Sequence, residues 1–182
     1  MKRILLTDLP TFTDKPGEVN VVIETPSGSR NKFAYNPERD VIEFSKSLPA
    51  GSMFPREFGF IPSTLGDDGD PLDVLVFMDE PMYPGILVPA RLIGVIQAEQ
   101  TEKGETLRND RLIAVASSCQ DYETVRALGD LEPNIVVQIE HFFISYNELA
   151  GRKFKPIGRA DGEHAMKLVE EGRARAAGKR SG

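Results

Sequence analysis

The sequence runs Asp67-Asp68-Gly69-Asp70-Pro71-Leu72-Asp73 and then continues directly into the apolar run Val74-Leu75-Val76-Phe77. A continuous apolar run of this length predicts a strand that is buried on both faces. Asp73 opens this strand, where a solvated acidic turn would already have ended, and Pro71 fixes the backbone between the aspartates. Crowded carboxylates raise one another's pKa values, so the segment is favourable either with a bound cation or as a fully solvated turn.

The chemistry of this acidic segment narrows the choice of cation. Four carboxylates within seven residues offer only oxygen ligands, which suit a hard cation such as Mg²⁺ or Ca²⁺. A calcium-binding loop counted from Asp68 fails, because Leu72 stands at the fifth position, where an oxygen ligand is required. A magnesium site that keeps open positions for water and for substrate phosphates fits the spacing better.

Short strands, separated by many prolines and glycines, are predicted for the first two-thirds of the chain. The apolar run itself predicts a strand over residues 73–78, and the polar stretch 100–110 is expected to be a loop. Such short, punctuated strands are typical of a small antiparallel barrel or sandwich. The other expected strands cover residues 18–25, 32–36, 40–44, 86–88, 90–99 and 111–116.

Helices are predicted for the last third of the chain. Apolar residues recur every three and four positions over residues 133–149, with Pro133 suited to the first turn and Gly151 to the position after the end. A shorter helix is expected after Asp121, which is a good N-cap, and a last helix around residues 165–169. Residues 173–182 are basic and rich in small residues, which predicts a frayed tail.

Composition and charge indicate a globular protein and exclude several functional classes. The chain has 182 residues, of which 40% are hydrophobic and 27% charged, so a mostly disordered chain is ruled out. Its formal net charge of -6 argues against nucleic acid as a partner, because phosphates demand a basic face. No apolar run reaches membrane length, and no signal peptide is recognised. The single cysteine, Cys119, cannot form an internal disulfide, which fits a cytoplasmic enzyme.

The acidic segment resembles a known family at a specific motif. Asp68-Gly69-Asp70-Pro71-Leu72-Asp73-Val74 matches the D-x-D-P-x-D-x motif of soluble family I inorganic pyrophosphatases, and residues 53–62 resemble that family's aromatic-Pro-x-x-Tyr-Gly-aromatic-Ile segment. The resemblance extends in order over roughly residues 15–150 and identifies the chain as a divergent member of the family. The other corresponding segments are residues 21–24, 31–33, 94–96, 112–115 and 141–146.

This resemblance implies a fold and an activity. The expected fold is α+β: a small closed five-stranded antiparallel β-barrel, OB-like, flanked by α-helices, as in the pyrophosphatase fold. One domain is expected over residues 1–182, with its core at about 15–150 and a C-terminal helix and tail at 161–182. The implied activity is Mg²⁺-dependent hydrolysis of inorganic pyrophosphate, with Mn²⁺ as a substitute metal. Family members of this length are usually hexamers, so a homo-oligomer is expected, with the hexamer favoured.

The resemblance also implies roles for individual residues. Asp68 and Asp73 correspond to the core metal ligands, and Asp70 to the carboxylate that accepts a proton from the metal-bound nucleophilic water. Glu24 corresponds to a carboxylate of an outer metal position, and Asn109 takes the place of a later metal aspartate. The expected phosphate-binding residues are Lys32, Lys46, Arg111 and Tyr146.

Several positions depart from the family pattern. Lys46 stands for the family's arginine, which keeps the charge but loses the bidentate fork, and Arg111 stands for a lysine. The alignment of the loop over residues 99–111 leaves alternatives, in which Glu99 or Asp110 supplies the carboxylate, although strand alternation would aim Asp110 at the other face. Family carboxylates, phenols and a lysine are absent at Ala34, Phe54, Phe58, Gln100, Asn109 and Asn147.

These departures leave two alternatives to pyrophosphate hydrolysis. The first is a pyrophosphatase-like protein that binds phosphate with weakened catalysis or none. The second is a hydrolase of another diphosphate, for which a changed set of phosphate contacts has reshaped the pocket. Release of orthophosphate from pyrophosphate, compared with release from organic diphosphates, separates the three hypotheses.

Overall fold

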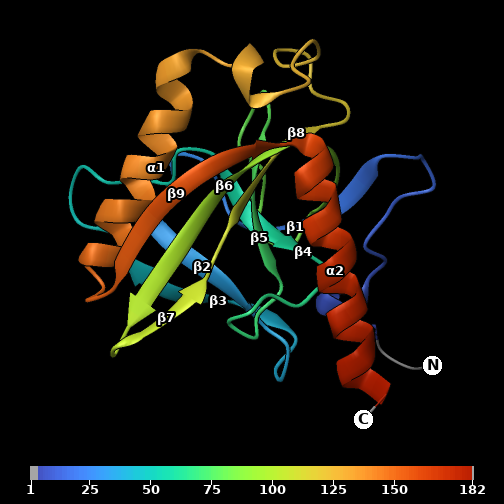
Figure 1. The fold of residues 1–182 in the computed structure, drawn as a ribbon, viewed down its shortest axis with the longest axis horizontal. Coiled ribbons are helices and arrows are strands. Elements are labelled where there is room, and N and C mark those ends of the chain that lie inside the picture. Colours follow the sequence, from blue (N-terminus) through green and yellow to red (C-terminus); the bar gives the residue numbers. More distant parts are fainter. Residues whose placement is uncertain (1–3, 182) are drawn as a thin grey trace.

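The computed structural model describes residues 4–181 (Figure 1). The short 3-10 helices are Leu6–Asp8 and Leu128–Asp130, and the long helices are α1 (Pro133–Glu148) and α2 (Gly162–Ser181). The strands are β1 (Glu18–Thr25), β2 (Asn31–Asn36), β3 (Val41–Ser47), β4 (Glu57–Ile61), β5 (Leu72–Phe77), β6 (Leu87–Glu102), β7 (Glu105–Arg108), β8 (Arg111–Ala116) and β9 (Lys153–Asp161).

Five of these strands form a closed ring. The order is β1-β4-β5-β8-β6, and the ring closes because β6 also pairs with β1. The expected five-stranded barrel is thus confirmed, but the expectation that it is entirely antiparallel is wrong. The pair β5 and β8 runs parallel, from Val74 opposite Leu112 to Phe77 opposite Val115. The barrel interior is apolar, since every residue of β8 and the last four residues of β5 are buried.

The strand β6 is longer than the sequence suggests. Two separate strands were predicted at 86–88 and 90–99, followed by a loop at 100–110, whereas the chain forms one strand of 16 residues and a hairpin with β7. Lys103 and Gly104 connect the two strands, with φ of 52° and 87°. Positive φ at both central residues matches the tight turns that join twisted antiparallel strands. The polar residues of the expected loop are therefore held in a regular hairpin that extends beyond the barrel.

The helices expected at 133–149 and around 165–169 are both found, the second of them within α2, whereas two other expectations for this part of the chain are wrong. The long amphipathic helix at 133–149 is confirmed as α1, but the shorter helix expected after Asp121 is wrong. The Asp79 carboxylate accepts the backbone N–H groups of Gln120 and Asp121 at 2.8–3.2 Å, which holds that segment in turns. The expected tail at 173–182 is also wrong as far as Ser181, because α2 continues through it; Gly182 lies outside the described residues.

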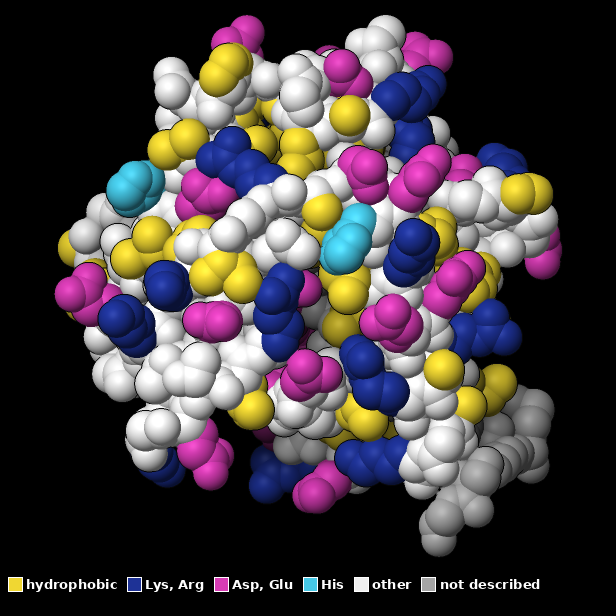
Figure 2. All heavy atoms as spheres, in the orientation of Figure 1, with side chains coloured by type: hydrophobic (Ala, Val, Ile, Leu, Met, Phe, Trp, Pro, Cys, Tyr) yellow, Lys and Arg dark blue, Asp and Glu magenta, His cyan; other side chains and the backbone are white. Residues whose placement is uncertain are grey.

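Both long helices pack on the extended sheet. α1 packs against β9, and α2 packs against β6 and β9, as Figure 1 shows. On the face drawn in Figure 2, acidic and basic side chains are interspersed over α2 and β9. Among the helices formed by residues 4–181, none has the length and apolarity needed to cross a membrane.

Candidate active site

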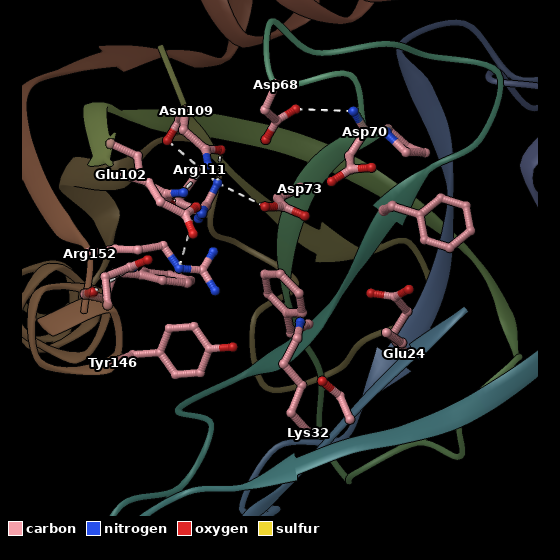
Figure 3. A pocket seen from close by; sticks show the side chains of 18 of the residues that line it. Glu24, Lys32, Asp68, Asp70, Asp73, Glu102, Asn109, Arg111, Tyr146 and Arg152 are labelled. Carbon is pink, nitrogen blue, oxygen red and sulfur yellow. Dashed lines mark hydrogen bonds and ion pairs between the residues drawn. The ribbon is translucent and has the colours of Figure 1, made fainter. Parts of the chain in front are cut away.

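A cavity of about 880 Å³ opens between the mouth of the barrel, the antiparallel pair β2 and β3, the hairpin of β6 and β7, and α1. It is lined by residues from β1 to β8 and from α1, so segments distant in the sequence meet there. Figure 3 shows Asp68, Asp70 and Asp73 on one side of the cavity and Tyr146 on the other. The nine residues singled out from the sequence all line it: Glu24, Lys32, Lys46, Asp68, Asp70, Asp73, Asn109, Arg111 and Tyr146.

The aspartates lie in and beside the turn that leads into β5. Asp68 Oδ1 accepts the backbone N–H of Asp70 at 3.1 Å, which orders the turn around Gly69. Both side chains are exposed at the cavity mouth, yet partial enclosure raises the pKa of each above its usual value. The nearby charge of Asp73 raises both values further. This side of the cavity therefore carries carboxylates whose charge is unfavourable without a partner.

Glu24 and Lys32 form a second, more enclosed charged pair. Glu24 Oε1 accepts the Tyr35 backbone N–H at 2.7 Å, which joins the end of β1 to the hairpin of β2 and β3. Burial raises the pKa of Glu24 to about 7, opposed by the charge of Lys32. Burial also lowers the pKa of Lys32, whose Nζ lies 4.5 Å from the centre of the Phe58 ring. The missing phenol at position 58 has thus left an apolar ring under the lysine.

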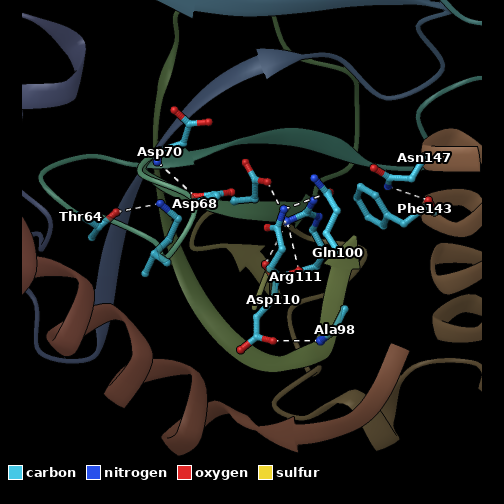
Figure 4. A network of polar contacts seen from close by, with 12 residues as sticks. Thr64, Asp68, Asp70, Ala98, Gln100, Asp110, Arg111, Phe143 and Asn147 are labelled. Atoms are coloured by element: carbon cyan, nitrogen blue, oxygen red, sulfur yellow. Dashed lines mark hydrogen bonds and ion pairs between the residues drawn. The ribbon is translucent and has the colours of Figure 1, made fainter. Parts of the chain in front are cut away.

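Arg111 is the buried cation at the centre of the polar network in Figure 4. Its Nη1 lies 2.8 Å from Asp73 Oδ2 and also donates to Asn109 Oδ1. Two aromatic rings lie against the guanidinium, with Cζ at 4.9 Å from the centre of Phe143 and 5.3 Å from that of Phe154. The side chain is only 6% exposed, so its charge is fixed between the carboxylate and the amide.

Amides occupy the edge of the cavity formed by β6 and β7. Asn109 Nδ2 donates to Gln100 Oε1 at 3.1 Å, and Asn109 Oδ1 is already engaged by Arg111. Glu99 is not among the residues that line the cavity. Asp110 Oδ1 accepts the Ala98 backbone N–H at 2.9 Å, as Figure 4 shows, so this carboxylate points away from the cavity. The two alternative assignments of the loop carboxylates are therefore not supported by the geometry.

The opposite wall carries cationic and aromatic groups. Lys46 Nζ lies 4.3 Å from the centre of the Tyr146 ring. Desolvation lowers the pKa of Lys46 and raises the pKa of Tyr146. Arg152 completes this wall and was not identified from the sequence. It follows the end of α1 in the short loop over residues 149–152, where a single arginine gives no signal that separates it from a surface residue.

The donor set fits a hard cation by its chemistry. The acidic side offers only carboxylate oxygens, and partial burial together with the nearby charge of Asp73 raises the pKa values of Asp68 and Asp70, which a bound cation would oppose. Within residues 4–181, no three carboxylate, imidazole or thiolate groups are already gathered in a form that could hold a metal ion. Water and a substrate would therefore supply the remaining ligands, as is usual for Mg²⁺.

Comparison with known proteins assigns the family. The family model described as "Inorganic pyrophosphatase" matches residues 21–177. The chain belongs to the inorganic pyrophosphatase family. It is 35% identical to the inorganic pyrophosphatase of Thermus thermophilus, covering 93% of this chain and 94% of that protein. The corresponding protein of Halalkalibacterium halodurans is 37% identical, covering 86% and 94% of the two chains.

Solved structures agree with this family assignment. The crystal structure of the Thermus thermophilus pyrophosphatase superposes with a TM-score of 0.85 at 36% identity, covering 93% of this chain and 97% of that one. A structure of an inorganic phosphatase from Anaplasma phagocytophilum gives a TM-score of 0.85 at 30% identity, covering 93% and 99%. The pyrophosphatase fold expected from the acidic motif is therefore confirmed.

Proposed function

We propose that the chain hydrolyses inorganic pyrophosphate to two orthophosphates by direct attack of water, with Mg²⁺ as the metal and Mn²⁺ as a substitute. One observation carries the proposal: Asp68, Asp70 and Asp73 line the same cavity as Lys32 and the other phosphate-binding candidates. The names of the relatives, which are inorganic pyrophosphatases, support the same substrate.

Each residue then has a role in the reaction. Asp68 and Asp73 would hold the metal, which when bound lowers the pKa of a water ligand and neutralises phosphoryl oxygens. Asp70, with its raised pKa, accepts the proton of the attacking water. The water oxygen forms a bond to one phosphorus while the bond from that phosphorus to the bridging oxygen breaks. The bridging oxygen leaves with the other phosphate.

The cationic groups bind and orient the phosphates. Desolvation lowers the pKa values of Lys32 and Lys46, which disfavours their charged forms. The negative charge of a bound phosphate stabilises those charged forms. Arg111 and the Tyr146 hydroxyl complete the phosphate contacts. Glu24 serves an outer metal position, and Asn109 is the weakest of the proposed ligands because its side-chain oxygen already accepts from Arg111.

A second candidate function is phosphate binding with weakened catalysis. The observation in its favour is the contact of Arg111 with both Asp73 and Asn109. A fixed guanidinium beside Asp73 competes with a metal for that carboxylate, and the adjoining amides offer no negative charge to hold another cation.

Orthophosphate release from pyrophosphate, measured while Mg²⁺ and then Mn²⁺ are varied, tests the proposal. Metal-dependent release in excess of release from organic diphosphates supports pyrophosphate hydrolysis. Binding of a non-hydrolysable analogue without turnover supports the second candidate. Faster release from an organic diphosphate overturns both in favour of a different substrate.

We also propose that the chain is one domain, forms a homo-oligomer with a hexamer favoured, and acts in the cytoplasm. Continuity of the core supports one domain, since Val19, Val95, Phe143 and Val169 belong to the same cluster of buried side chains. The single buried cysteine, Cys119, supports a reducing compartment. Light scattering of the purified protein tests the oligomer size.

A further inference from the structure

The lysine that the family pattern places beside Tyr146 is Asn147 in this chain, and its side chain does not replace that lysine. Asn147 is buried, and its Nδ2 donates to the Phe143 backbone oxygen one turn earlier at 2.8 Å. One N–H of the amide is thus engaged by the helix backbone, and the amide carries no positive charge. The cavity wall has lost a cation at this position.

Arg152 brings a cation to the same wall from the loop after α1. Gly151 has φ of 72°, a conformation that suits glycine at a helix end, and the Arg152 backbone N–H donates to Asn147 oxygen at 2.9 Å. This turn directs the Arg152 side chain along the cavity wall beside Tyr146, as Figure 3 shows. The side chain of Arg152 therefore stands close to where the lysine is missing.

The guanidinium of Arg152 lacks a full set of partners. Its Nε is buried and has no hydrogen-bond acceptor among residues 4–181. The nearest carboxylate oxygen, Glu102 Oε2 at the end of β6, is 3.8 Å away, which is an ion pair but too long for a hydrogen bond. A buried N–H without an acceptor is unfavourable, so an anion that reaches it gains a strong charge-assisted contact.

Arg152 acts electrostatically on the phosphate-binding candidates. Its charge contributes to the lowered pKa values of Lys46 and Lys32 and opposes the rise in the pKa of Tyr146. Arg152 and Lys32 stand across the cavity from Asp68 and Asp70 in Figure 3. Such mutual repulsion is relieved by a bound dianion.

We infer that Arg152 is a substrate-binding residue, which holds the pyrophosphate phosphate that lies away from the aspartates. In the free protein Glu102 of the β6–β7 hairpin pairs with Arg152, and the phosphate displaces that carboxylate. This inference rests on the proposed function and adds to it a residue that the sequence motif does not contain.

Calorimetric binding of methylenediphosphonate in the presence of Mg²⁺ tests the inference in the full-length protein. We expect Arg152→Gln to weaken binding about ten-fold or more, the typical value of a lost hydrogen bond between charged groups. KM for pyrophosphate should rise by a similar factor, and Arg152→Lys should recover part of the loss. The matched control is Lys153→Gln, which removes the same charge from the neighbouring exposed side chain and should bind as the wild type does.

Glu102→Gln gives an independent reading. Removal of the competing carboxylate should tighten methylenediphosphonate binding by about two-fold to five-fold, since a partly exposed pair is worth under about 1 kcal/mol. Wild-type affinity in a folded Arg152→Gln variant, or an equal loss in Lys153→Gln, would overturn the inference, as would a wild-type protein that does not bind the analogue. Binding without hydrolysis by the wild type would instead refute only the proposed reaction.

Discussion

Two edges of the same cavity differ in how their polar groups are satisfied. At the turn before β5, Asp68 and Asp70 have raised pKa values and few partners. At the β6–β7 hairpin, Gln100 and Asn109 bond to one another, and Arg111 bonds to Asn109. The first edge needs an added cation, whereas the second already contains one in the guanidinium. A family member can therefore lose carboxylates on the second edge while the amides and the guanidinium bond to one another, with only Arg111 Nε left buried and without a partner on this edge among residues 4–181.

Asp73→Asn should have the largest effect on the contrast between the two edges, because Asp73 belongs to the first edge and also contacts Arg111 of the second. We expect metal-dependent activity to fall at least about 100-fold, since a catalytic metal contributes several kcal/mol. The fold should remain, because the asparagine oxygen can still accept from Arg111. The measurement is thermal stability with and without Mg²⁺, with Asp67→Asn as the control of equal charge outside the cavity. A mutant that keeps the wild-type Mg²⁺-induced rise in melting temperature rules out Asp73 as a principal ligand.

The pH dependence of the stability of the metal-free protein should report on Glu24, a buried carboxyl group of β1 that lies outside the turn before β5. Burial raises the pKa of Glu24 to about 7 in the folded protein, from its ordinary value of 4.5. Between these values only the folded state keeps the proton, so the free energy of unfolding should fall as pH rises from about 4.5 to 7 and then level off. The contribution is on the order of 3 kcal/mol at most, from the linkage of pKa shift to stability.

Urea unfolding at several pH values, with metal chelated, measures this slope. Glu24→Gln should remove the contribution of Glu24 to this slope, leaving that of the other carboxyl groups with raised pKa values, Asp68 and Asp70 among them, and should be more stable than the wild type above pH 7. Equal slopes for the two proteins would show that Glu24 is ionised in the folded state at pH 5 to 6. Glu43→Gln is the control, because that exposed glutamate has a lowered pKa and should leave the falling slope in place.

Activity should increase when the amide edge is given back a charge. The double variant Phe58→Tyr, Asn109→Asp restores a phenol under Lys32 and a carboxylate beside Arg111. We expect activity to rise roughly ten-fold, or the Mg²⁺ requirement to fall, because a well-placed charged hydrogen bond contributes about 1.5–3 kcal/mol. Initial rates over a Mg²⁺ series measure it. If the folded variant binds Mg²⁺ no better and stays as slow, the family roles at these two positions do not apply here.

The smallest effect concerns the turn that supports the amide edge. Gly104 has φ of 87° and open space around an added Cβ, so Gly104→Ala adds backbone strain without a clash. We expect a loss of about 1 kcal/mol of stability and a less than about three-fold change in activity. Gly178→Ala in the exposed part of α2 should instead stabilise the protein by about 0.5–1 kcal/mol. Melting temperatures of both variants check the opposite signs.

Local sequence patterns predicted those helices and strands in which the buried residues are spaced regularly along the chain. The apolar run after Asp73 and the apolar face of α1 were found because each element is buried in a regular way. The strand β9 was missed because only Phe154 in its sequence is buried. The last turns of α2 were missed because small residues such as Ala176, rather than large apolar ones, pack there.

The candidate site was predictable where chemistry is concentrated in the sequence. Asp68, Asp70 and Asp73 are adjacent in the chain, so their proximity needs no tertiary information. By contrast, Arg152 lies beside Tyr146 because of the turn at Gly151, and it lies near Glu102 because of the β6–β7 hairpin. Neither contact can be read from the sequence alone. The parallel pairing of β5 with β8 was equally invisible, since a strand's own pattern does not reveal its neighbour's direction.

The length of β6 has a consequence for amide hydrogen exchange. Its first half pairs with β1 and β8 inside the barrel, while its last residues pair with β7 and β9 in the protruding hairpin. Amides of the barrel half should exchange only on global unfolding, and those near Thr101 should exchange by local fraying. Asp73 is anchored to the slowly opening unit and Glu102 to the rapidly opening one. The two ends of the cavity can therefore rearrange on different timescales within one continuous strand system.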